Sequence, residues 1–166
     1  MNELNTKLYI DSKEYSYKKY FKFGKEGKYE IKIKFSIKLK DCSYMFEGCK
    51  NIISIDLTNF KSEDIENMEY MFFNCKNLRN INLLSLKVEN VKNMGYMFYG
   101  CNNINLDLSS FVIKKNVNMI NIFNNYINLN YFNFYSLIFK NKDNKNYIQK
   151  KNQKCLMKKE LKMNIK

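Results

Sequence analysis

Apolar residues recur along the middle of the chain at an almost constant spacing. The hexapeptide Tyr44–Cys49 (YMFEGC) returns as Tyr70–Cys75 (YMFFNC) and Tyr96–Cys101 (YMFYGC), each 26 residues after the last, and a degenerate copy, Asn121–Tyr126, follows 25 residues later. In each unit, apolar residues then follow in the pattern Leu-x-x-Leu-x-Leu-x-x-Leu/Phe, with one residue deleted after Ile104 in the third unit. The two central apolar residues are two apart, so both point to one side of a short strand. One unit cannot bury so much apolar surface alone, and the pattern therefore predicts stacked repeats.

The repeats are predicted to span 42–137, with units at 42–68, 69–94, 95–119 and 120–137. Equivalent side chains of successive units would then meet about 4.8 Å apart in continuous columns. We therefore predict a repeat solenoid, a short leucine-rich-repeat, β-solenoid-like stack of three to four coils. Its apolar columns contain Ile52, Ile55, Leu57 and Phe60, then Leu78, Ile81, Leu83 and Leu86, then Ile104, Leu106, Leu108 and Phe111, and last Leu129, Phe132, Phe134 and Leu137.

The residues before the repeats show a different periodicity. From 28 to 40, apolar residues alternate without a break with polar ones, which are lysines except for Glu30 and Ser36, and this predicts a half-buried antiparallel strand. Weaker strands are predicted at Tyr15–Phe23 and around Leu8–Ile10, with turns at Asp11–Ser12 and Gly24–Gly27. We expect residues 1–41 to form a β-hairpin or meander that caps the first coil, because exposed ends of repeat arrays need caps. Residues 138–166 are expected to be a basic tail, disordered or weakly helical.

The repeat units resemble a known family. The segments YMFEGCKNIISIDLTNF, YMFFNCKNLRNINLLSL and YMFYGCNNINLDLSSF are similar to the BspA-like leucine-rich repeat, which also occurs as a repeat of unknown function in mycoplasma-type surface proteins. The resemblance covers about residues 42–137. It implies a binding or adhesion scaffold, often at the cell surface of bacteria and protists, with no known catalysis.

Composition removes several classes of function. The chain has a formal charge of +13, no His, and Arg79 as its only arginine. A histidine-based catalytic triad, a His-containing zinc or haem site and an arginine clamp for phosphate are therefore excluded. The charge lies at the ends, with +5 in 1–41, zero in 42–139 and +8 in 140–166. The lysine and asparagine excess matches A/T-rich codons, so it is weak evidence for a nucleic-acid partner.

The repeated cysteines and methionines are interpreted as core residues. Stacked columns place Cys49, Cys75 and Cys101 on a line with parallel side chains, which fits neither the convergent geometry of zinc nor that of a disulfide. The methionine columns adjoin repeated phenylalanines and fit core filling better than copper binding. We expect no cofactor and no metal.

The strand residues that alternate with core positions form a candidate partner-binding face. This face is small, polar and nearly neutral, which suits hydrogen bonding to a peptide, a protein loop or a glycan. A solvated sheet face with side-chain amide ladders explains it equally well. Its residues are Ser54, Asp56, Thr58, Asn80, Asn82, Leu84, Asn105, Asp107, Ser109, Tyr131, Asn133 and Tyr135.

The face does not predict an enzyme. Asp56 and Asp107 share a column two coils apart, roughly 9 to 10 Å, at or beyond the limit for a pair of glycosidase carboxylates. The sequence therefore favours non-catalytic recognition of a protein or glycan. Two alternatives stay open, a structural or truncated repeat fragment without its own partner, and a non-specific polyanion binder acting through the lysine-rich ends.

The chain as written predicts no signal peptide and no membrane span, since its first residues are polar and no long apolar run follows. We expect a monomer that is cytoplasmic as written, with no specific nucleic-acid partner, although the family that it resembles is often at the cell surface or secreted.

Overall fold

The computed structural model describes residues 6–16, 25, 27–114 and 117–123. These residues fall in two compact units, Met1–Lys38 and Leu39–Lys166, and each unit is described by itself. The predicted tail from 138 and most of the strand predicted at Tyr15–Phe23 lie outside the described residues. The capping role predicted for residues 1–41 stays a prediction.

The first unit contains a three-stranded antiparallel sheet. Its strands are β1 (Thr6–Ile10), β2 (Lys13–Tyr15) and β3 (Ile31–Phe35), in the order β2-β1-β3. The predicted turn at Asp11 and Ser12 is confirmed: both residues have positive φ, 47° and 69°, as two-residue hairpin loops require. β3 is shorter than the predicted strand at 28–40; Ile33 and Phe35 are half-buried beside exposed lysines as expected, whereas Ile31 is 47% exposed.

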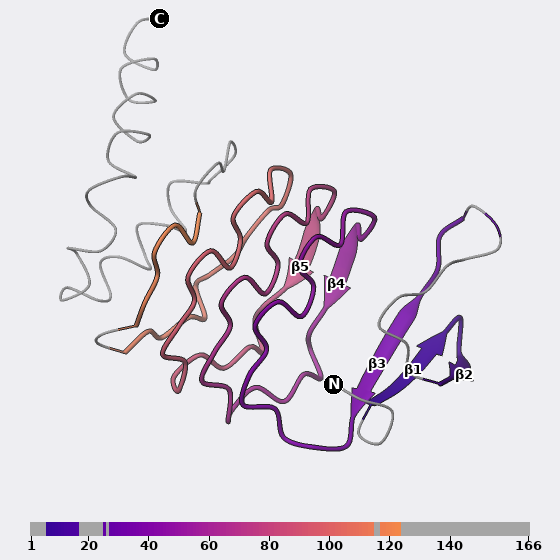
Figure 1. The fold of residues 1–166 in the computed structure, drawn as a ribbon, viewed down its shortest axis with the longest axis horizontal. Coiled ribbons are helices and arrows are strands. Elements are labelled where there is room, and N and C mark those ends of the chain that lie inside the picture. The colour runs from indigo at the N-terminus through magenta and orange to yellow at the C-terminus, as the bar shows by residue number, and fades with distance from the viewer. Residues whose placement is uncertain (1–5, 17–24, 26, 115–116, 124–166) are drawn as a thin grey trace, which may run out of the picture. The chain divides into compact units, whose positions relative to one another are not determined.

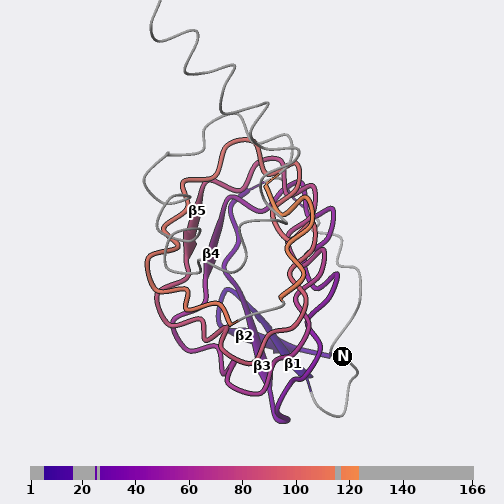
Figure 2. The same ribbon diagram turned by 90° about the vertical axis from the view of Figure 1, so that its left-hand side faces the viewer.

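The second unit is built from two ladders of parallel pairs. In one ladder, β4 (Ser54–Asp56) pairs with β5 (Asn80–Asn82), and Asn80 bridges to Asn105. The second ladder runs through Asp41, Asn67, Asn93 and Asn118. Figure 1 shows successive units side by side, and Figure 2 shows β4 and β5 on one side of the coils with segment 117–123 on the other.

The pairing follows the spacing of the sequence repeats. Asp41 and Asn67 are 26 residues apart, whereas Asn93 and Asn118 are 25 apart, after the single deletion that the alignment places behind Ile104. Equivalent residues of successive units therefore lie next to one another. The assignment of this array to the leucine-rich-repeat solenoids stays a prediction.

The core between the two ladders consists of the repeated apolar columns. Rings of Phe46, Phe72, Phe98 and Phe123 stack nearly parallel, with centroids 5.4, 5.4 and 6.1 Å apart. In the second and third units the Met, Phe and Cys columns are fully buried; they are Met68, Met71, Phe72 and Cys75, then Met94, Met97, Phe98 and Cys101. Each fully buried side chain of this size contributes roughly 1.5 to 3 kcal/mol relative to exposure.

The cysteine column has a role beyond filling space. The Cys75 Sγ donates to the carbonyl oxygen of Phe46 at 3.0 Å, and the Cys101 Sγ donates to that of Phe72 at 2.9 Å. The four described cysteines are free thiols. Hydrogen bonding to Cys101 together with burial raises the pKa of Cys75, and burial raises the pKa of Cys42 to about 12. Cys42 and Cys75 therefore stay protonated at neutral pH, and the thiols of Cys75 and Cys101 each bond to the backbone of the preceding unit.

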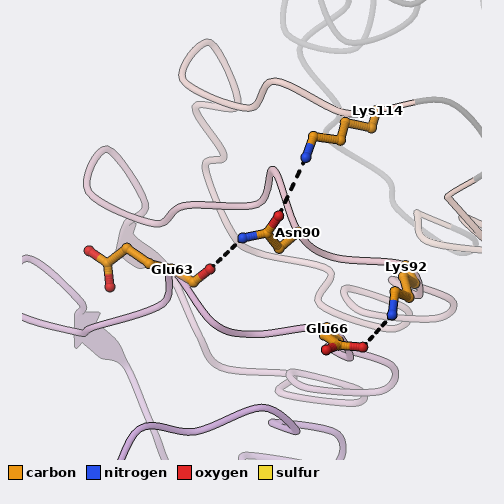
Figure 3. A network of polar contacts seen from close by, with 5 residues as sticks. All are labelled: Glu63, Glu66, Asn90, Lys92 and Lys114. Carbon is orange, nitrogen blue, oxygen red and sulfur yellow. Dashed lines mark hydrogen bonds and ion pairs between the residues drawn. The ribbon is translucent and has the colours of Figure 1, made fainter.

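Polar contacts join the units at the corner that follows the strands. The Asn90 side-chain amide donates to the backbone carbonyl of Glu63 at 2.7 Å, and Lys114 Nζ donates to Asn90 Oδ1 at 3.4 Å (Figure 3). Glu66 and Lys92, in neighbouring units, form an ion pair beside them. These are exposed contacts, so each stabilises the stack only modestly.

Candidate binding face

The structure describes nine of the twelve residues predicted for the partner-binding face. All nine are exposed, and they come from three successive units. The core positions between them are half-buried at Ile55 and Ile81 and buried at Leu57 and Leu83. The alternation of the sequence thus corresponds to an inner and an outer surface. Tyr131, Asn133 and Tyr135 lie outside the described residues.

Local hydrogen bonds hold the central column of the face. Asp56 Oδ1 accepts from the backbone N–H of Thr58 at 2.9 Å and from its hydroxyl at 2.6 Å. Asp107 Oδ1 accepts the backbone N–H of Ser109 at 2.9 Å in the same way. Such bonds to a residue two positions on are typical of Asx turns. They fix each side chain where the chain leaves its strand.

The amide between the two carboxylates joins neighbouring units. Asn82 Oδ1 accepts the backbone N–H of Leu84 at 3.2 Å, while Asn82 Nδ2 donates to the hydroxyl of Thr58 at 3.0 Å. Asn82 therefore makes the same turn as its neighbours and adds a bond across the face. Part of the polar capacity of the face is therefore satisfied within the protein.

The two carboxylates on the face are ionised at neutral pH. Hydrogen bonds from the Thr58 hydroxyl and N–H lower the pKa of Asp56, and hydrogen bonds from Ser109 lower the pKa of Asp107. Each carboxylate keeps lone pairs for a partner, because an ionised carboxylate offers about four acceptor sites. The face therefore presents two fixed negative charges in one column.

Apolar groups stand among these polar residues. The Leu84 side chain is 60% exposed, and Ile53, directly before β4, is 47% exposed. Leu84 follows the Asn82 turn, in the column that contains Thr58 and Ser109 in the neighbouring units. Ile53 was not among the predicted residues, because the alternation gives it the same side as the core residues Ile55 and Leu57. An apolar group in a polar setting is a common anchor in protein interfaces.

The sequence analysis missed a second set of ordered residues, on the other ladder. The side-chain oxygens of Asp41, Asn67, Asn93 and Asn118 each accept the backbone N–H two residues on, at 2.8 to 3.1 Å. Asn118 Nδ2 also donates to Asn93 Oδ1 at 2.9 Å. The available signal was an asparagine directly before the methionine at 68, 94 and 119. This column shapes the turn that precedes each aromatic hexapeptide.

The carboxylates of the face lie in different units. Asp56 and Asp107 are separated by the Asn82 unit, and no group of three metal-binding side chains occurs among the residues that the structure describes. A shallow hollow of about 130 Å³ belongs to the N-terminal unit and is lined by Tyr9, Ser12, Glu30, Lys32 and Lys34, so it contains none of the candidate residues. Within the described ranges, no helix is long and apolar enough to cross a bilayer.

Repeated units that pair in register define a repeat protein, and comparison of the whole chain agrees with that class. The chain belongs to the family described as Mycoplasma protein of unknown function, DUF285, whose model matches residues 38–157. The match includes all four predicted units and extends beyond residue 137, where the repeats were predicted to end. Comparisons with curated proteins and with solved structures gave no match.

Proposed function

We propose that this chain is a non-catalytic leucine-rich-repeat scaffold of the BspA-like type, and that it binds a partner protein through the outward strand face. One observation carries the proposal: nine side chains from three successive units are exposed on one face, and backbone pairing and Asx turns hold them in register. A rigid surface of this kind loses little conformational entropy when it binds.

The chemistry of the face favours a protein over a glycan as the ligand. Leu84 supplies a protruding apolar anchor, and the ionised Asp56 and Asp107 supply acceptors around it. Apolar anchors surrounded by polar groups are typical of protein hot spots. The resemblance to BspA-like repeats, whose relatives often serve in adhesion, supports the same function.

The test is a pull-down from lysate of the source cells with three immobilised baits. These are the wild-type chain, Leu84→Glu and the matched control Val112→Glu, whose side chain is 56% exposed on a column outside the face. We expect one protein to be retained by the wild-type and control baits and lost with Leu84→Glu. Equal capture by all three baits would show that the strand face is not the binding site.

The salt dependence of binding distinguishes this function from non-specific polyanion binding. Recognition through Leu84 should survive a rise in NaCl from 0.15 to 0.5 M, whereas nucleic acid held by lysines would be released, because its affinity falls steeply with salt. Captured RNA or DNA that is lost at the higher salt concentration, with no retained protein, would replace the proposal with the polyanion-binding alternative.

A further inference from the structure

A second exposed surface lies on the ladder opposite the strand face. Its aromatic strip consists of Tyr44, Tyr70, Phe73, Tyr96 and Tyr99, all exposed or half-buried. The rings of Tyr44, Tyr70 and Tyr96 are nearly parallel, with centroids 5.0 and 4.8 Å apart, and Phe73 stacks on Tyr99 at 5.1 Å. Tyr70 also meets Phe73 edge to face at 5.0 Å. Five rings from three units thus form one continuous surface.

The tyrosines of the strip are held in an uncommon backbone conformation. Tyr44, Tyr70 and Tyr96 have φ of 58°, 56° and 56°, in the left-handed region that bulky residues seldom adopt. Asn121 occupies the same place in the next unit at 52°. The conformation turns each tyrosine ring outward, while the Met and Phe that follow it enter the core.

Two carboxylates border the strip. Glu69 directly precedes Tyr70, and Glu47 occupies in the first unit the position that Phe73 occupies in the second. The backbone N–H of Tyr44 donates to the carbonyl oxygen of Glu69 at 3.0 Å, and the backbone N–H of Glu47 donates to that of Tyr44 at 3.1 Å, so both residues lie beside the tyrosine ladder. Neither carboxylate takes part in an ion pair among the described residues. The strip is therefore bordered by two carboxylates that a cationic partner can pair with.

We propose that the aromatic strip binds an extended, arginine- or lysine-rich segment of a protein partner. The cationic groups reach Glu47 and Glu69, and the aliphatic stems lie across the tyrosine ring edges. Tyr44 is 50% exposed and stacks on Tyr70, so the exposed part of its ring offers a cation–π contact. Guanidinium groups suit this surface best, because they stack on rings and pair with carboxylates in a fork.

The overall charge excludes long-range attraction as the source of this binding. The chain carries +13, so long-range electrostatics repel a cationic peptide and attract an anionic one. Binding of a cationic peptide must therefore arise from a local acidic site, and its loss with Glu47→Lys and Glu69→Lys would assign it to the strip rather than to the carboxylates of the strand face. The proposal does not depend on the strand face, since the two surfaces share no residue.

The test uses fluorescence anisotropy with two fluorescein-labelled peptides, four Arg-Gly repeats and four Glu-Gly repeats. Glu47→Lys with Glu69→Lys is compared with Glu63→Lys and Glu89→Lys, which match it in exposure class and in total charge change. We expect the Arg-Gly peptide to bind the wild-type chain, to lose at least about tenfold in affinity with the first pair and to lose less than about threefold with the second.

A third variant tests the rings separately from the charges. Tyr44→Ala removes a half-exposed side chain, so circular dichroism should show an unchanged fold, while Arg-Gly affinity should fall about fivefold or more. Equal losses in the two charge-reversed pairs would overturn the proposal. So would the absence of Arg-Gly binding up to roughly 1 mM, the weak end of measurable affinity.

Discussion

Substituting Gly100 by Ala should reveal how closely successive units approach each other. Gly48, Asn74 and Gly100 are equivalent residues of three units, and all have positive φ, at 66°, 57° and 76°. A Cβ on Gly100 would lie 2.3 Å from the side-chain oxygen of Asn74, whereas a Cβ on Gly48 would meet nothing within 4 Å. Gly48→Ala is therefore a control with the same backbone strain and no steric conflict.

The two substitutions should differ clearly in their effect on stability. A left-handed alanine costs about 1–2 kcal/mol, partly offset by about 0.4–1 kcal/mol from the smaller entropy of the unfolded chain. We therefore expect Gly48→Ala to lower the free energy of unfolding by about 1 kcal/mol. Gly100→Ala must also displace the Asn74 amide, and overpacking of this kind adds about 1–3 kcal/mol.

Urea unfolding followed by circular dichroism measures both effects, and a double-mutant cycle with Asn74→Gly isolates the contact. With Asn74→Gly as background, Gly100→Ala should cost no more than Gly48→Ala, which gives a coupling energy of at least about 1 kcal/mol. Additive effects, or equal destabilisation by the two alanines in the wild-type background, would refute the close approach of residues 74 and 100.

Two further predictions concern ionisable groups. In a Cys155→Ser background, the fully buried Cys75 and Cys101 should react with a thiol reagent only as fast as the stacked units open. The half-buried Cys49 should react sooner. Rapid labelling of Cys101 would contradict its burial in the core. Because hydrogen bonds from Thr58 lower the pKa of Asp56 below its ordinary 3.8, its stabilising contribution is present above that pH and is lost as the pH falls through the folded-state value. Asp56→Asn should therefore flatten the fall of the urea midpoint below pH 4, and a curve identical to that of the wild-type chain would contradict this.

The pairing of the units could be read from the sequence because repetition makes the signal redundant. The Tyr, Met, Phe and Cys columns each contain three or four copies of one residue type, so the deletion behind Ile104 was visible as a change in spacing from 26 to 25. The outer face followed from the same alternation, and its nine described residues are exposed. The three residues predicted for its end, Tyr131, Asn133 and Tyr135, lie outside the described residues and stay predictions.

The hydrogen bonds of the asparagine ladder could not be read in this way. Asparagine is frequent in this chain, so composition alone could explain why it directly precedes Met68, Met94 and Met119. Its role depends on a turn in which the side-chain oxygen accepts the backbone N–H two residues on, and that turn is defined by backbone angles. The positive φ angles of the repeated tyrosines could not be predicted either, because residue type alone predicts Gly or Asn at such positions.

The distribution of charge between units follows from their pairing. Residues that pair across a ladder lie directly opposite their copies, where like charges are destabilising. At those positions each carboxylate has an amide as its neighbour: Asp41 accepts from Asn67 at 3.4 Å, and Asn82 is paired with Asp56. At the corner, where the described structure has no ladder pair, Glu63 and Glu89 are equivalent residues of neighbouring units. The amide at 82 therefore lets the strand face carry two carboxylates in one column, because it separates Asp56 from Asp107 and donates a hydrogen bond to Thr58.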